Sequence, residues 1–226
     1  MTVGITFLCS GGGGNLKLLH SLGRCGALPS VLVSGVIADR ECGALEWARS
    51  NAIPTRMLAY TRLQPEALRG ALADFAPDVV ITTVHKILDD KLVAEYDGRL
   101  VNLHYSLLPA FAGIIGMEAV RRARQHGCRL VGATAHRVTA ELDGGPILAQ
   151  ACAADDLQQA EKTLHDAVFR CGGVALVAAL EGVVSPHSSQ RGGLLKAGDL
   201  PVFAAPLPRA PVCAVMRDHA FWEALR

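Results

Sequence analysis

The fold is decided by the stretch Val3-Gly4-Ile5-Thr6-Phe7-Leu8-Cys9-Ser10-Gly11-Gly12-Gly13-Gly14-Asn15, close to the start of the sequence. Its apolar run Val3–Cys9 is typical of a buried strand. Residues 15–22 follow with the apolar spacing of a helix. A strand, a glycine turn and a helix in this order predict the first βα unit of a parallel sheet.

The same alternation continues along the chain. Further strands are expected at residues 31–37, 79–84 and 100–103, and further helices at 43–50, 65–75 and 89–95. Beyond Pro109 the pattern predicts a helix at 117–126, two antiparallel strands at 130–138 and 146–152, and a long helix at 157–180. The predicted fold class is therefore α/β. It is a Rossmann-like, mostly parallel twisted sheet with helices on both faces and antiparallel strands in the C-terminal part.

The composition changes near residue 185. From Ser185 onward Ser, Gly, Pro and Arg are frequent, and the apolar residues are spaced out by Pro201, Pro206, Pro208 and Pro211. Such a stretch predicts a loosely structured segment. We therefore expect one domain over residues 1–184 and a C-terminal extension over residues 185–226.

Composition limits the classes of function. The chain has 226 residues, half of them hydrophobic, and a formal net charge of +1, so it can bury a large core and has no basic footprint for nucleic acid or anionic membrane. Its seven cysteines are scattered, which favours reduced thiols. With no signal-peptide pattern and no apolar run of membrane-spanning length, we expect a cytoplasmic protein. Its assembly stays open, and a homodimer is one alternative.

Two segments place polar side chains at strand-to-loop junctions. Asn102 and His104 alternate on a predicted strand, so they share one face, and a turn at Pro109 follows. Asp143 lies in an Asp-Gly-Gly-Pro loop between the two predicted antiparallel strands. Taken singly, these residues could satisfy loop carbonyls or form a turn. Together an amide, an imidazole and a carboxylate favour a reaction site.

The glycine loop has two interpretations. Gly11, Gly12, Gly13 and Gly14 lead into Asn15 at a helix N-terminus, where backbone N–H groups and the helix dipole can hold a phosphate or carboxylate. The loop matches neither the dinucleotide fingerprint nor the Walker pattern. The alternative is a tight turn in which Asn15 or Ser10 caps the helix.

Three motifs in order carry a family resemblance. They are the glycine loop, Asn102-Leu103-His104-Tyr105-Ser106-Leu107-Leu108-Pro109, and the run from His136 to Pro146 that contains Val138 and Asp143. On these motifs the chain resembles the folate-dependent formyltransferases, nearest to the glycinamide ribonucleotide transformylases, from about Thr2 to about Val184. The resemblance implies a catalytic trio of Asn102, His104 and Asp143, and no metal.

The resemblance also implies a co-substrate, 10-formyltetrahydrofolate. Its pterin would lie in a cleft lined by two loops, formed by Val84, His85, Lys86, Ile87 and Leu88, and by Thr139, Ala140, Glu141 and Leu142. The glycine loop and Asn15 would then bind the acceptor or its phosphate. The partner implied is a small-molecule amine.

The chemistry agrees with these residue types. When an amine attacks a formyl carbon, an oxyanion forms, one proton leaves the amine and another reaches the departing folate nitrogen. Asn102 can donate to the oxyanion, and a protonated His104 can do the same. Asp143 can orient the imidazole and relay a proton. We interpret the nearby His136 as a structural residue on a strand face.

Several departures leave the acceptor open. The family has Ser or Thr where Gly14 precedes Asn15, and polar residues where this chain has Gly113-Ile114-Ile115-Gly116. The run Gly132–His136 is similar to formyltetrahydrofolate hydrolase, which delivers the formyl group to water. Three functions therefore compete: an amine formyltransferase, which we favour, the hydrolase, and a non-catalytic folate or nucleotide binding module.

Overall fold

The computed structural model describes residues 2–84, 86–184 and 191–225. The chain divides into two compact units. Unit 1 contains Met1–Asn102 and Arg137–Leu142, and unit 2 contains Leu103–His136 and Asp143–Arg226.

Unit 1 is built on parallel strands. They are β1 (Val3–Cys9), β2 (Val31–Ala38), β3 (Thr55–Met57), β4 (Val79–Thr83) and the beginning of β5 (Leu100–His104). Their order across the sheet is β3-β2-β1-β4-β5, and each neighbouring pair is parallel. This confirms the predicted parallel sheet, to which the structure adds the three-residue strand β3.

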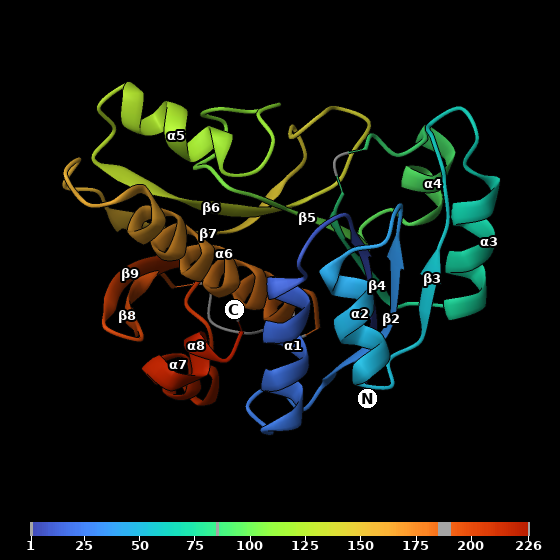
Figure 1. The fold of residues 1–226 in the computed structure, drawn as a ribbon, viewed down its shortest axis with the longest axis horizontal. Coiled ribbons are helices and arrows are strands. Elements are labelled where there is room, and N and C mark those ends of the chain that lie inside the picture. Colours follow the sequence, from blue (N-terminus) through green and yellow to red (C-terminus); the bar gives the residue numbers. More distant parts are fainter. Residues whose placement is uncertain (1, 85, 185–190, 226) are drawn as a thin grey trace. The chain divides into compact units, whose positions relative to one another are not determined.

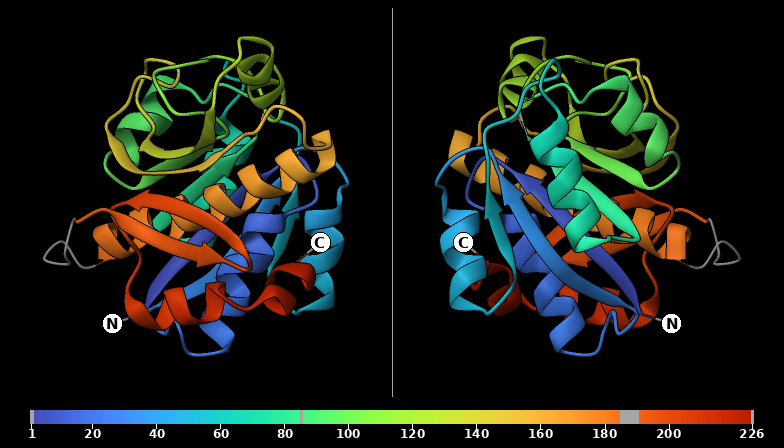
Figure 2. Two further views of the ribbon diagram at one scale, coloured as in Figure 1. Left: turned by 90° about the vertical axis from the view of Figure 1, so that its left-hand side faces the viewer. Right: turned by 90° about the vertical axis from the view of Figure 1, so that its right-hand side faces the viewer.

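Four helices connect these strands. They are α1 (Gly14–Arg24), α2 (Gly43–Ser50), α3 (Glu66–Phe75) and α4 (Asp90–Glu95). Leu68 and Leu72 of α3 and Leu92 of α4 join Leu8 and Val80 in one buried cluster. Figures 1 and 2 show α1 and α2 on one face of the strands and α3 on the other. The predicted two-sided covering of the sheet is therefore present.

Unit 2 is built on antiparallel strands. They are β6 (Leu130–Arg137), β7 (Ile147–Ala154), β8 (Gly193–Ala197) and β9 (Leu200–Ala205), in the order β6-β7-β9-β8. The predicted antiparallel pairing of the two strands around the Asp143 loop is confirmed. The helices of this unit are α5 (Glu118–Gln125), α6 (Glu161–Val184), α7 (Ala210–Met216) and α8 (His219–Glu223).

Helix α6 corrects the expectation that no segment has the length and composition of a membrane span. By those two measures its 24 residues could cross a bilayer, but 78% of its most apolar window is buried inside the protein. It packs on β7 and β9 of its own unit. A helix that is hydrophobic all round and covered on most sides is a core helix.

The C-terminal segment is not loosely structured, so that prediction was wrong. Its described part forms β8, β9, α7 and α8, and two buried charges of α6 anchor it. Arg170 donates to Ala197 O at 2.9 Å, and Glu181 accepts from Arg209 N and Arg209 Nε at 2.7 and 2.9 Å. The division into a domain of residues 1–184 and an extension of residues 185–226 stays a prediction.

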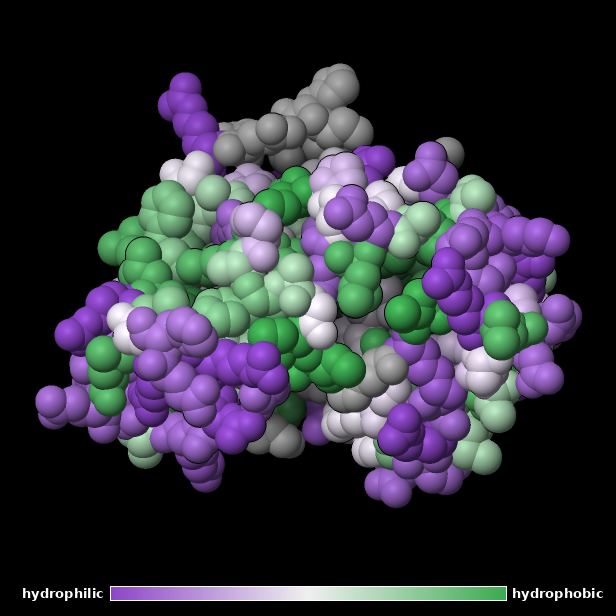
Figure 3. All heavy atoms as spheres, turned by 90° about the horizontal axis from the view of Figure 1, so that it is seen from above, coloured by the Kyte–Doolittle hydropathy of each residue, from purple (hydrophilic) through white to green (hydrophobic). Residues whose placement is uncertain are grey.

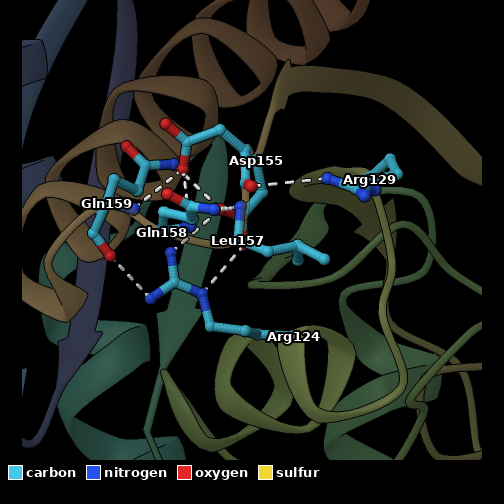
Figure 4. Close-up of polar contacts among 7 residues, drawn as sticks. Arg124, Arg129, Asp155, Leu157, Gln158 and Gln159 are labelled. Carbon is cyan, nitrogen blue, oxygen red and sulfur yellow. Dashed lines mark hydrogen bonds and ion pairs between the residues drawn. The ribbon is translucent and has the colours of Figure 1, made fainter.

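A charged clamp fixes α5 to the connection between β7 and α6 (Figure 4). The buried Asp155 carboxylate accepts from Arg124 Nε and Nη2 at 3.0 and 2.9 Å, and from the backbone of Leu157 at 2.9 Å. Arg124 also donates to Gln159 O at 2.9 Å. The hydrogen bond from Arg124 lowers the pKa of Asp155 from 3.8 to about 2. Bidentate pairing of this kind fixes orientation as well as distance.

Candidate active site

His104 is held at the end of β5 with both ring nitrogens in contact with the protein. Its side chain is buried, and Nε2 lies 3.1 Å from the carbonyl oxygen of Phe111. Because a carbonyl only accepts, Nε2 must carry a hydrogen. Nδ1 lies 3.4 Å from Asp143 Oδ2. The imidazole is therefore oriented from two sides.

Asp143 lies in the turn between β6 and β7 and has a left-handed backbone, with φ of 53°. Among residues other than glycine, Asp and Asn tolerate the left-handed backbone region best. Its Oδ2 accepts from the backbone N–H of Gly113 at 2.8 Å, and its Oδ1 lies 3.7 Å from His136 Nε2. The carboxylate is thus held by a backbone donor and faces two imidazoles.

The two ring nitrogens of His104 have different partners. Since Nε2 donates to Phe111 O, Nδ1 is the ring nitrogen that faces the Asp143 carboxylate. The geometry therefore places an imidazole and a carboxylate side by side at ion-pair distance. Such a pair can donate to a developing oxyanion and accept a proton afterwards.

The turn before α5 is held by polar side chains of the strands in unit 2. Thr134 of β6 donates to Ser106 O and accepts from Leu108 N, at 2.7 and 3.0 Å. Gln150 of β7 donates to Leu108 O at 3.0 Å. Ser106 itself donates to Ala110 O at 2.5 Å, which agrees with a turn-capping role. These bonds fix the segment that carries Phe111.

His136 was interpreted from the sequence as structural, and its side chain is indeed buried in β6. The structure adds that its ring faces Asp143 Oδ1. The predicted pair of antiparallel strands indicated that His136 lies near the loop that holds Asp143. The sequence does not give the register of the two strands, so it did not show that the His136 ring points toward the Asp143 carboxylate.

Asn102 is the last residue of unit 1 before the chain enters unit 2. It belongs to β5 and donates through Nδ2 to Thr82 O of β4 at 3.0 Å. Alternation along β5 gives Asn102 and His104 the same side of the strand. The amide is oriented by this hydrogen bond, and its catalytic role stays a prediction.

The glycine loop in unit 1 makes a close approach that a side chain would prevent. Gly13 is the N-cap of α1 with φ of 75°, and a Cβ there would lie 2.9 Å from Ala44 Cβ. Gly11 O accepts from Ala44 N at 3.0 Å. Gly14 and Asn15 open the helix, and Asn15 is buried. The phosphate-binding role predicted for Gly11–Gly14 and Asn15 stays a prediction.

Beside this loop, the Asp39 carboxylate is paired with two cationic side chains. Its carboxylate accepts from Arg40 at 2.9 and 3.1 Å, and Lys86 Nζ lies 3.3 Å away. The pKa of Asp39 is held well below its usual range, chiefly by the hydrogen bond from Arg40 and further by Ser10 and Lys86. Lys86 also donates to Tyr60 O at 2.9 Å. The predicted cation of the folate loop therefore already has two partners.

The other residues of the two predicted folate loops differ in exposure. Val84 and Leu88 pack in the buried cluster of unit 1, whereas Ile87 is about half exposed. His85 lies outside the described residues. In the second loop Thr139 donates to Glu141 O at 3.3 Å, and Ala140, Glu141 and Leu142 are exposed. Their contacts with a folate stay predictions.

No group of three or more His, Cys, Asp or Glu in the described ranges is placed to hold a metal ion. The seven cysteines are all free thiols. Burial raises the pKa of Cys9 to about 12, so this thiol is un-ionised at neutral pH. We assign no chemistry to it.

A parallel sheet in unit 1, an antiparallel sheet in unit 2 and a buried imidazole–carboxylate pair define an α/β protein suited to acid–base chemistry at a carbonyl group. The family model described as formyl transferase matches residues 3–180, and the chain belongs to that family. The resemblance stated from its motifs is thereby confirmed.

Individual relatives carry two different names. The chain is 32% identical over 171 residues to a phosphoribosylglycinamide formyltransferase, chloroplastic, of Arabidopsis thaliana, covering 70% of this chain and 59% of the relative. It is 36% identical over 103 residues to a formyltetrahydrofolate deformylase of Haemophilus influenzae, covering 43% and 36%. The chain thus spans about half the length, or less, of these relatives.

A solved structure supports the same fold. Glycinamide ribonucleotide transformylase 1 from Symbiobacterium toebii superposes with a TM-score of 0.72 at 30% identity, covering 79% of this chain and 86% of that chain. The mixed parallel and antiparallel arrangement predicted from the sequence is therefore that of this family.

Proposed function

We propose that this protein transfers the formyl group of 10-formyltetrahydrofolate to the amine of a small-molecule acceptor. The observation that carries the proposal is the His104–Asp143 pair, in which Nδ1 of a buried imidazole lies 3.4 Å from a carboxylate oxygen while Nε2 is oriented by Phe111 O. Family membership supplies the reaction class. Glycinamide ribonucleotide and a different, specialised amine are both candidate acceptors.

In the proposed reaction the amine nitrogen attacks the formyl carbon and a tetrahedral intermediate forms. Its oxyanion accepts from the Asn102 amide and from the His104 Nε2–H, a donor that Phe111 O engages in the structure. Asp143, directly or through a water, takes the proton that leaves the amine. That proton, or an equivalent one, reaches the folate nitrogen as the carbon–nitrogen bond to the donor breaks.

The remaining predicted contacts assign binding roles. The two folate loops, at residues 84–88 and 139–142, would hold the donor. The glycine loop, which offers backbone N–H groups at the start of α1, would hold an anionic group of the acceptor. No metal is needed, because the charged donors are side chains.

The test uses purified protein, 10-formyltetrahydrofolate and a set of amines that includes glycinamide ribonucleotide. We expect tetrahydrofolate and a formylated amine to appear together, detected by absorbance and by mass spectrometry. Asp143→Asn should lower the rate by about 100-fold or more, since it removes the carboxylate from the site. Asp74→Asn, on an exposed ion pair of α3, is the matched control and should leave the rate unchanged.

The second candidate is hydrolysis of the donor, favoured by the similarity to the deformylase. It predicts rapid loss of the formyl group as formate in the absence of any amine. Formate release that needs no amine would replace the transferase proposal by the hydrolase. If Asp143→Asn left biological activity unchanged, a non-catalytic binding role would replace both.

A further inference from the structure

Both groups that orient the His104 imidazole come from residues with a left-handed backbone. Phe111, whose carbonyl oxygen accepts from Nε2, has φ of 60°, and Asp143, whose Oδ2 faces Nδ1, has φ of 53°. Ala52 and Ala76 share this conformation, but each lies just after a helix, where it commonly ends the helix. Phe111 follows no helix, and positive φ is rare and costly for a bulky residue. The conformation of Phe111 therefore needs a separate explanation.

The backbone on either side of Phe111 is fixed by hydrogen bonds within unit 2. Ala110 O accepts from Ser106 Oγ at 2.5 Å. Two residues beyond Phe111, Gly113 N donates to Asp143 Oδ2 at 2.8 Å. A bulky residue keeps a positive φ only where its surroundings over-determine the conformation. These two anchors supply part of that restraint.

The ring of Phe111 supplies a further restraint. It is partly buried, packs against the core cluster that contains Val120, Ala123 and Val131, and meets the His126 ring edge-on with the centroids 5.8 Å apart. Figure 3, which looks onto the end of the molecule that carries α5, shows hydrophobic side chains that reach the surface among hydrophilic ones. Contacts of an aromatic ring with a core are favourable, so they offset the cost of the left-handed backbone.

The left-handed backbone decides where the Phe111 carbonyl points. Its oxygen lies 3.1 Å from His104 Nε2, and because a carbonyl only accepts, the ring hydrogen is held on that nitrogen. In the proposed reaction this same hydrogen is donated to the oxyanion. If Phe111 left the left-handed region, its carbonyl would turn away and the imidazole would lose one of its two orienting partners.

From these observations we propose that Phe111 is a positioning residue for formyl transfer. Packing of its ring holds a strained peptide, and the carbonyl of that peptide orients His104 with the hydrogen on Nε2. Phe111 acts through His104 and takes no part in proton transfer. Its effect on the rate rests on the proposed formyl transfer, whereas its effect on the imidazole can be measured without any substrate.

The kinetic experiment compares Phe111→Ala with Phe111→Gly. Both variants lose the ring, but alanine keeps the cost of a positive φ and glycine does not. We expect kcat/KM for formyl transfer to fall by about 5- to 30-fold in Phe111→Ala, the factor in population to which that cost corresponds. The fall should be clearly smaller in Phe111→Gly, and Phe111→Tyr, which keeps the ring, should retain the rate of the unmodified protein. A residue that acted only by packing would give no advantage to glycine over alanine.

The matched control is the same pair of substitutions at Phe203 of β9. Phe203 is 49% exposed and lies in a strand, where φ is negative. There Phe203→Gly should have a lower melting temperature than Phe203→Ala, since glycine weakens a strand. At Phe111 the order of the two melting temperatures should be reversed. Neither Phe203 variant should change kcat/KM.

A second measurement follows His104 directly. In the nitrogen-15 magnetic resonance spectrum of protein labelled in histidine, we expect Nε2 of His104 to carry a hydrogen in the unmodified protein. Exchange of this hydrogen with water should be about 5- to 30-fold faster in Phe111→Ala, as the carbonyl turns away, and less accelerated in Phe111→Gly.

Two results would overturn the role of Phe111. One is a hydrogen found only on Nδ1 of His104 in the unmodified protein, which requires no variant to fold. The other is a Phe111→Gly variant that is no better than Phe111→Ala in both rate and hydrogen exchange. Absence of any formylated amine with the unmodified protein would refute formyl transfer itself, and the exchange rates would still decide whether Phe111 holds the imidazole.

Discussion

Replacing Asp155 by Asn tests how firmly the clamp in Figure 4 holds unit 2. The Asp155 side chain is fully buried, and both its oxygens accept from Arg124. The asparagine side chain has nearly the same size as aspartate but carries no charge. Its NH2 group is a donor, and so is every N–H of the Arg124 guanidinium, so the two cannot hydrogen-bond. Asp155→Asn therefore leaves Arg124 without its counterion.

The magnitude follows from the pKa of Asp155. A fall from 3.8 to about 2 corresponds to about 2 kcal/mol of stabilisation of the folded state by the ionised carboxylate. For a chain of this size we expect Asp155→Asn to lower the melting temperature by about 4–8 °C at neutral pH.

The dependence on pH has a defined sign. Because the pKa is lower in the folded protein than in the unfolded chain, the stabilisation is complete above about pH 4 and is lost as the pH falls through about 2. Thermal unfolding followed by circular dichroism should therefore show that the difference in melting temperature between the unmodified protein and Asp155→Asn becomes smaller as the pH falls from about 4 to about 2. Asp74→Asn, which changes an exposed ion pair, should have the same melting temperature as the unmodified protein. Equal melting temperatures for Asp155→Asn and the unmodified protein at neutral pH would refute the reasoning.

Three further outcomes are expected. Gly13→Ala should cost about 1–2 kcal/mol of unfolding free energy from its left-handed backbone alone, whereas Gly11→Ala, whose Cβ would meet no atom within 4 Å, should cost much less in the same denaturant titration; equal costs would contradict the close approach. A thiol reagent at mildly basic pH should label the exposed Cys25 well before Cys9, whose pKa is about 12, as mass spectrometry of peptides would reveal; early labelling of Cys9 would mean that its strand opens readily. Glu181→Ala should make the C-terminal segment more sensitive to limited proteolysis, because a buried acceptor of two hydrogen bonds is lost; an unchanged cleavage pattern would show that apolar packing alone holds it.

The sequence predicted most of the elements because their hydrophobic periods are clear. The helix at residues 43–50 and the strand at residues 3–9 were predicted with the bounds that the structure has. Helix α6 begins at Glu161 and not at the predicted Leu157, since Leu157 has φ of 67°. Strand β3 was missed because three residues, two of them exposed, leave no readable pattern.

The C-terminal segment was misread because proline was taken only as a breaker. Pro201 lies in β9 outside the part that pairs with β7, so its missing N–H costs no bond on that side. Pro211 occupies the first turn of α7, where a proline is tolerated. In both places proline is compatible with regular structure, and only the pairing partners reveal it.

For the candidate site, the family resemblance carried by the motifs implied that His104 and Asp143 act together, and the structure places them 3.4 Å apart. The sequence could not provide what surrounds them, because hydrogen bonds from Gly113 N and to Phe111 O depend on the path of a loop. The facing of His136 toward Asp143 depends on the register of β6 with β7. Backbone contacts and register are three-dimensional properties that residue type alone does not encode.

The left-handed backbone of Asp143 restricts which residues can occupy this position. A random library there would be filtered first by conformation, since bulky and β-branched side chains are strained at positive φ. Glutamate would keep a carboxylate but fit this backbone poorly. Asparagine and glycine would fit the backbone but would remove the carboxylate. Laboratory evolution toward another acceptor must therefore proceed through neighbouring positions, with aspartate left in place.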